Sequence, residues 1–228
     1  MKRYLSVYAL AARASFIKVV AVTVLAAAAS AILLLGAPQG KQLKIVCFLP
    51  AILGFIAISV MLSRLGTGKG SQPFYTVMRL RIKPRMVTFI WAIYNSIMLM
   101  FYRAMLMLVF YGVISGKIKN IGPQAVLIAS YGNSYLHNLL PLRAYPAWML
   151  LISATLLMGC TCAFIPENQW RGKNRSFLLI AVMICSIAFM RIPMGSALSA
   201  IFSFACIGVI AWIAIDMYAE EENDESHQ

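Results

Sequence analysis

Acidic residues are scarce in this 228-residue chain, which has 7 Asp and Glu against 20 Lys and Arg. Charged residues of both signs make up only 12% of the sequence, whereas a soluble domain carries about 25%. Hydrophobic residues make up 61%, and a soluble fold of this length could not bury that excess. We therefore expect an integral membrane protein in a lipid bilayer.

Residue groups that carry chemistry are also scarce. The chain has two His and no Cys-x-x-Cys pair, so we expect no structural metal site. The five Cys all lie in apolar stretches, where a free thiol behaves as a small hydrophobic group. The net charge of +13 comes from basic residues between apolar runs, a pattern that sets membrane orientation. We therefore expect no nucleic-acid partner and no cofactor in this chain.

Six apolar runs predict an all-α integral membrane protein with six transmembrane helices, because a span needs about 20 residues. The predicted spans are residues 19–36, 45–62, 86–114, 147–165, 177–190 and 197–218. The fifth is short and can span if Arg191 reaches outward, and Pro193 and Gly195 then form a tight connection to the sixth. Residues 1–218 thus form a single transmembrane domain, followed by a disordered acidic tail at 219–228.

The distribution of basic residues predicts the orientation of these spans. With both termini in the cytoplasm, 13 basic residues lie on the inner side and six on the outer side. We therefore expect a multi-pass protein of a bacterial plasma membrane with both termini cytoplasmic. Residues 4–17 combine aromatic, aliphatic and basic side chains, which predicts an N-terminal interfacial helix lying on the inner leaflet.

The inner segment between the second and third predicted spans contains two features. Residues 66–70 contain three Gly and one Lys but lack the spacing of a phosphate-binding loop, so we interpret them as a linker. Residues 73–83 follow with apolar side chains near helical spacing and several basic residues, which predicts a short transverse helix. This helix either rests on anionic lipid headgroups or docks into a soluble partner, and the residues leave both interpretations open.

The outer segment 115–146 is too long for a turn and too apolar for a free loop. It predicts two short helices that form a re-entrant or interfacial lid between the third and fourth spans. We do not expect Ser134 and His137 in this lid to form a serine-protease site, because the sequence offers no third residue that would orient the imidazole.

Arg103 is the one ionisable residue well inside a predicted span, and Asn95 lies near the same helical face. One interpretation is that this intramembrane charge marks a transport pathway. The other is a structural role, in which the Arg103 side chain reaches the outer headgroups or bonds to backbone carbonyls of a neighbouring helix. Asp216 is the only acidic residue in the predicted spans, and no carboxylate cluster is present. A carrier driven by protons or sodium is therefore disfavoured.

The stretch from Tyr75 to Arg85, running into Trp91-Ala92-Ile93-Tyr94-Asn95, resembles small permease subunits of ATP-binding-cassette exporters in Gram-positive bacteria. The outer stretch from Ser134 to Leu142 is similar to the same proteins. In that family a helix of the first inner loop contacts the ATPase subunit. The resemblance therefore implies a coupling helix, whose contact residues here are Phe74, Tyr75, Met78, Arg79 and Arg81.

The resemblance further implies that this chain is not an enzyme, that a partner ATPase subunit binds ATP and Mg, and that a second permease subunit, identical or paralogous, completes the pore. One feature departs from the family, since the enlarged outer connection lies between spans three and four rather than five and six. The alternative is the substrate-binding membrane component of a vitamin-uptake transporter. In that case the small residues 26–31 would pack against a partner helix.

Overall fold

The computed structural model describes residues 2–36, 48–65, 82–117, 145–170, 175–192 and 194–226. The described part of the chain is all-helical and contains no strand. Its helices are α1 (Lys2–Gly36), α3 (Phe48–Ser63), α5 (Pro84–Lys117), α8 (Tyr145–Trp170), α9 (Ser176–Arg191) and α10 (Ser196–Ser226).

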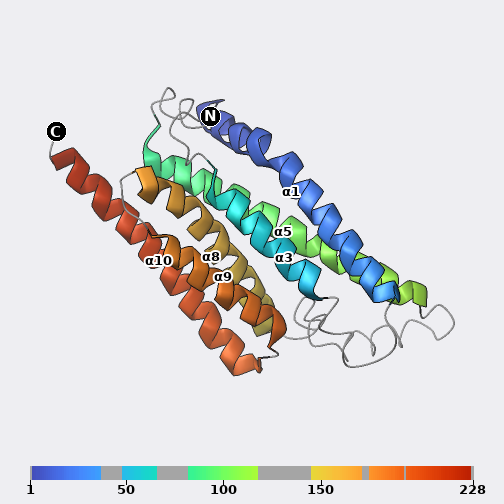
Figure 1. Ribbon diagram of the computed structural model, residues 1–228. Helices are drawn as coiled ribbons and strands as arrows, with labels where there is room; N and C mark the ends of the chain where they lie inside the picture. The colour runs from blue at the N-terminus through green and yellow to red at the C-terminus, as the bar shows by residue number, and fades with distance from the viewer. Residues whose placement is uncertain are drawn as a thin grey trace.

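Successive helices run in alternate directions along one bundle (Figure 1). The start of α1 and the end of α10 therefore lie at the same end of the bundle, which we call the terminal end. The first residues of α5 and the last residues of α8 lie at this end too. At the other end, only four residues separate the end of α9 from the start of α10, in agreement with the short connection that the sequence predicts.

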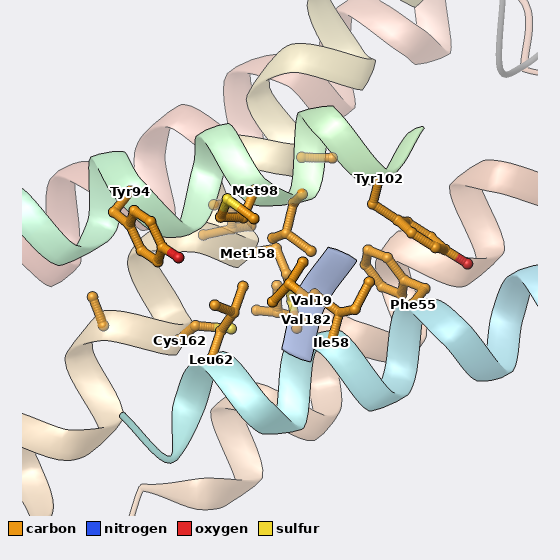
Figure 2. Close-up of a cluster of buried hydrophobic side chains, with 14 of the residues drawn as sticks. Val19, Phe55, Ile58, Leu62, Tyr94, Met98, Tyr102, Met158, Cys162 and Val182 are labelled. Carbon is orange, nitrogen blue, oxygen red and sulfur yellow. The ribbon is translucent and has the colours of Figure 1, made fainter. Parts of the chain in front are cut away.

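Helix α8 is the centre of the bundle, because it packs against α3, α5, α9 and α10. Helix α1 lies on the other side of α5 and also packs against α3. Figure 2 shows part of the shared core, where side chains of five helices meet. They include Val19 of α1, Phe55 of α3, Met98 of α5, Met158 of α8 and Val182 of α9. Apolar burial thus joins helices that are far apart in the sequence.

Among the residues that the structure describes, four helices are long and apolar enough to cross a membrane, namely those that contain Tyr4–Leu35, Arg85–Val113, Tyr145–Gln169 and Ser196–Met217. Helices α3 and α9 are apolar but shorter, with 16 residues each. Large apolar side chains also cover the outside of the bundle, as Leu25 of α1 and Phe204 of α10 illustrate. Such a surface is compatible with a multi-pass membrane protein whose helices contact lipid.

The N-terminal region differs from the prediction of a separate interfacial helix, because residues 2–36 form one continuous helix. The reason is a stripe of buried residues at four-residue spacing, Val7, Ala11, Ser15 and Val19. The Ser15 and Tyr94 hydroxyls are hydrogen-bonded at 2.9 Å, which joins α1 to α5. The segment expected on the lipid surface is therefore packed against the bundle.

Two other boundaries also need correction. Helix α10 extends to Ser226, so the acidic tail, which the sequence predicts to be disordered, continues the helix through most of its length. Helix α8 runs through Pro166 to Trp170, beyond the predicted end at residue 165. This extension makes Glu167 a second acidic residue inside the helical bundle, where the sequence analysis expected only Asp216.

Two glycines allow close contact between helices. A Cβ added at Gly54 of α3 would lie 2.7 Å from the Cβ of Ala26 in α1. A Cβ at Gly159 of α8 would lie 2.8 Å from the backbone nitrogen of Ser96 in α5. Both distances are shorter than van der Waals contact, so any larger residue would push the helices apart. Small residues therefore set the spacing of α1 from α3 and of α5 from α8.

Candidate functional site

The predicted coupling residues Phe74, Tyr75, Met78, Arg79 and Arg81 lie outside the described residues, as do the predicted lid helices between residues 118 and 144. The described chain resumes at Ile82. The carbonyl of Lys83 accepts hydrogen bonds from the backbone N–H groups of Met86 at 3.0 Å and Val87 at 3.4 Å. These bonds attach Lys83 to the first turn of α5, so the chain enters the helix without an intervening loop.

Arg103 lies inside the bundle, with 7% of its surface exposed. Its Nη1 donates a hydrogen bond of 3.2 Å to the carbonyl of Leu151 in α8. Its guanidinium carbon is 5.8 Å from the ring centre of Phe55 in α3. A cation over an aromatic face is favourable, and more so away from water. The side chain thus contacts two neighbouring helices, α8 and α3.

Asn95 is also buried, with 1% of its surface exposed, two turns before Arg103 on α5. Its Oδ1 has no hydrogen-bond partner among the described residues. Leaving a buried acceptor unbonded costs about 1–3 kcal/mol. The structure therefore brings Arg103 onto α8 and α3 but leaves Asn95 with an unused acceptor inside the bundle.

A polar contact that the sequence analysis missed joins α5 to α8 at the terminal end. The hydroxyl of Thr88 donates a hydrogen bond of 2.6 Å to Oε2 of Glu167. Both side chains are buried, with 4% exposed in each case. The next residue, Asn168, donates from Nδ2 to the carbonyl of Phe164. The stretch Pro166-Glu167-Asn168 is the only hint of this contact in the sequence. It is typical of the end of a helix, because proline disrupts helix interiors, but in the structure it lies within α8.

An ion pair joins α9 to α10 at the same end of the bundle. Nη1 of Arg175 lies 2.5 Å from Oδ2 of Asp216, and each side chain is about one-fifth exposed. The guanidinium also lies over the rings of Phe164 and Trp212, at 5.4 and 5.8 Å from their centres. Arg175 immediately precedes α9, and its side chain therefore connects the start of α9 to both α8 and α10.

Together these contacts give the terminal end two polar connections, Thr88–Glu167 between α5 and α8, and Arg175–Asp216 between α9 and α10. Within the described ranges, no three His, Cys, Asp or Glu side chains are grouped in a way that could hold a metal ion. Each connection joins side chains of two helices and therefore holds those helices in position.

Comparisons with known proteins return no match of this chain to a protein-family model, a curated protein or a solved structure.

Proposed function

We propose that this chain is the membrane-embedded permease subunit of a bacterial ATP-binding-cassette exporter, driven by a separate ATPase subunit that binds ATP and Mg. The observation that carries the proposal is the position of α5. This helix has 34 residues, about 51 Å of helix, and begins at Pro84, immediately after the basic segment 73–83. A contact made on that segment would act directly on a long helix that packs against both α1 and α8.

The contacts at the terminal end connect the start of α5 to other helices, so a movement of the segment before α5 would be passed on to them. Thr88 lies in the second turn of α5, and its hydrogen bond to Glu167 joins the start of α5 to α8, the central helix of the bundle. The Arg175–Asp216 pair joins α9 and α10 at the same level. A displacement of residue 83 would therefore move α5 and α8 together, as a rigid element with two positions does in a switching protein.

The charges at the two ends support a cytoplasmic position for the terminal end. Lys2, Arg3, Arg64, Lys83, Arg85 and Arg175 lie in helical turns or connections at that end. Lys117 and Arg191 lie at the other end. Because basic residues concentrate on the cytoplasmic side, the proposal places both termini in the cytoplasm.

The proposal includes six crossings of the membrane, four by the long helices and two by α3 and α9. A helix of 16 residues is about 24 Å long, a few ångströms short of the hydrocarbon core of about 30 Å. Local thinning of the bilayer can accommodate such a difference at modest cost. The alternating helix directions support this count, because each crossing must reverse the chain.

The vitamin-uptake alternative relied on small residues in α1 that would contact a partner helix. In the structure, Ala26 and Ala27 are buried, and Ala26 faces Gly54 of α3 within the same chain. These small residues therefore pack within this chain and no longer favour the alternative. We retain the exporter proposal, with a second permease subunit that is identical or paralogous.

The test is copurification of the ATPase subunit with the permease from detergent. We expect the double variant Phe74→Ala and Arg79→Ala to remain folded in the membrane and to lose most of the bound ATPase. Truncation of interface anchors of this kind costs about 2 kcal/mol or more each, although such values need not add.

The matched control is Arg13→Ala with Phe16→Ala, which removes the same residue types from exposed positions on α1. This variant should retain the ATPase at the level of the unmodified chain. Equal ATPase recovery from both double variants would contradict the coupling role of residues 73–83 and would leave the lipid-surface interpretation of that segment.

A further inference from the structure

Helices α1 and α5 are much longer than the hydrocarbon core of a membrane is thick. Their 35 and 34 residues correspond to about 52 and 51 Å of helix, against a core of about 30 Å. Such an excess is accommodated by tilting of the helix, or it projects from the membrane. Both helices begin at the terminal end, so the charges along them show which part lies in hydrocarbon.

Two exposed charges mark a level on α1. Arg13 and Lys18 are both exposed, and no charged residue follows Lys18 before the helix ends at Gly36. An exposed cation is unfavourable in hydrocarbon, and its long side chain reaches the headgroups only from close to the boundary. The hydrocarbon therefore begins near Lys18. From Lys18 to Gly36, α1 is about 27 Å long, close to the thickness of the core.

Contacts of Tyr94 relate this level to α5. The Tyr94 and Ser15 hydroxyls are hydrogen-bonded at 2.9 Å, and the Tyr94 ring packs edge-on against Tyr8, with 5.4 Å between the ring centres. Both partners precede Lys18 on α1, and the two helices run in the same direction. The part of α5 before Tyr94 therefore lies on the terminal side of Lys18. From Tyr94 to Lys117, α5 is about 35 Å long, enough to cross the core with a small tilt.

The other two long helices give a similar thickness. Arg175 forms its ion pair with Asp216 of α10 and lies over the ring of Phe164 in α8, so these residues share one level. Neither the part of α8 before Phe164 nor the part of α10 before Asp216 contains a charged residue. These two parts are about 29 and 30 Å long, which matches the hydrocarbon core.

Charged residues occur again on the terminal side of this level. Glu167 lies in the last turn of α8, with its carboxylate hydrogen-bonded to Thr88 in the second turn of α5. Helix α10 continues past Asp216 through five acidic residues, at positions 220–222, 224 and 225. Exposed apolar residues such as Leu5 and Met86 also lie on this side, so the charges set the boundary rather than the apolar residues.

We propose that a membrane surface surrounds the bundle at this level, where lipid headgroups contact the exposed Lys18 of α1. The same level passes Tyr94 of α5, Phe164 of α8 and Asp216 of α10. The terminal end projects beyond it, with about 24 Å of α1 and about 15 Å each of α5 and α10 outside the hydrocarbon. The proposal requires no ATPase partner, so its failure and that of the exporter function are separate results.

Labelling with a charged, water-soluble maleimide measures this level. The full chain is placed in lipid vesicles opened by freezing and thawing, so that the reagent reaches both faces of the membrane. Leu5→Cys and Met86→Cys should react about tenfold faster than Leu25→Cys and Leu108→Cys, because a reactive thiolate forms in water and not in hydrocarbon. All four positions are exposed on the bundle, and the unmodified chain with its five Cys supplies the background.

Size-exclusion chromatography in detergent checks that each variant is folded. A variant with a changed elution profile is replaced by a nearby exposed position on the same helix. Tyr4→Cys then takes the place of Leu5→Cys, and Phe89→Cys takes the place of Met86→Cys.

Two results would overturn the proposal. If either Leu5→Cys or Met86→Cys reacts as slowly as Leu25→Cys, the helix concerned lies in the membrane up to the terminal end and accommodates its length by tilting. If Leu25→Cys or Leu108→Cys reacts as fast as Leu5→Cys, water reaches the middle of the proposed spans, and the boundary at Lys18 is wrong.

Discussion

Thr88 and Glu167 are 79 positions apart in the sequence and are joined by a hydrogen bond of 2.6 Å between buried side chains. The bond connects the second turn of α5 to the last turn of α8, at the end of the bundle that holds both termini. A carboxylate is costly to bury unless it is hydrogen-bonded, so this contact stabilises the position of each helix relative to the other.

A double-mutant cycle measures the strength of this contact. We expect Thr88→Val and Glu167→Leu each to lower the thermal unfolding midpoint of the purified chain in detergent. The double variant should be less destabilised than the sum of the two, with a coupling energy of about 1 kcal/mol. Glu167→Gln keeps an acceptor for the Thr88 hydroxyl and should be the mildest of the substitutions. Additive effects in the cycle would show that the two side chains act independently.

Arg103→Leu tests the role of the buried cation. The substitution removes the hydrogen bond to the Leu151 carbonyl and the contact with Phe55, but it leaves an apolar side chain in an apolar site. Because the hydrogen-bond partner is a neutral carbonyl, the substitution leaves no unpaired charge behind, and Leu adds no polar group that would need a partner. We therefore expect normal insertion and assembly, measured by size-exclusion chromatography of the detergent-solubilised complex. An intact complex that has lost transport-coupled ATP hydrolysis would instead assign Arg103 to the transport pathway.

Gly159→Ala tests the close packing of α5 on α8. The added methyl group would overlap Ser96, both its backbone nitrogen and its side chain, so one of the helices must shift. Overpacking of this kind costs about 1–3 kcal/mol and should lower the unfolding midpoint. The control is Gly208→Ala on α10, where nothing lies within 4 Å of the added Cβ. That variant should be as stable as the unmodified chain or slightly more stable, because Ala favours the helix.

Labelling with a membrane-impermeant maleimide tests the orientation of the chain. A cysteine introduced at Gly122 should react from outside intact cells, whereas one introduced at Gly70 should react only after the membrane is permeabilised. The reason is the concentration of basic residues on the side that contains residue 70. The opposite pattern of labelling would reverse the orientation and would remove residues 73–83 from the cytoplasm.

The helices themselves were largely predictable from the sequence. The predicted spans 45–62, 86–114 and 177–190 correspond to α3, α5 and α9 within three residues at each end. The runs are contiguous and strongly apolar, so burial in lipid or in the core requires a helix whatever the neighbours are. The basic residues at 13 and 18 suggested a boundary in α1, but both are exposed on a helix whose other face is buried.

The sequence alone determined that the part of the chain described by the structure is an apolar bundle of helices, because hydrophobicity and helix formation depend on residues close together in the chain. Only the tertiary structure decided which polar groups meet. The Thr88–Glu167 bond, the Arg103 contact with Leu151 and the Arg175–Asp216 ion pair each need two or three helices to lie side by side. Side-chain packing sets that arrangement, through close approaches such as Gly159 against Ser96, and no local pattern in the sequence encodes these long-range contacts.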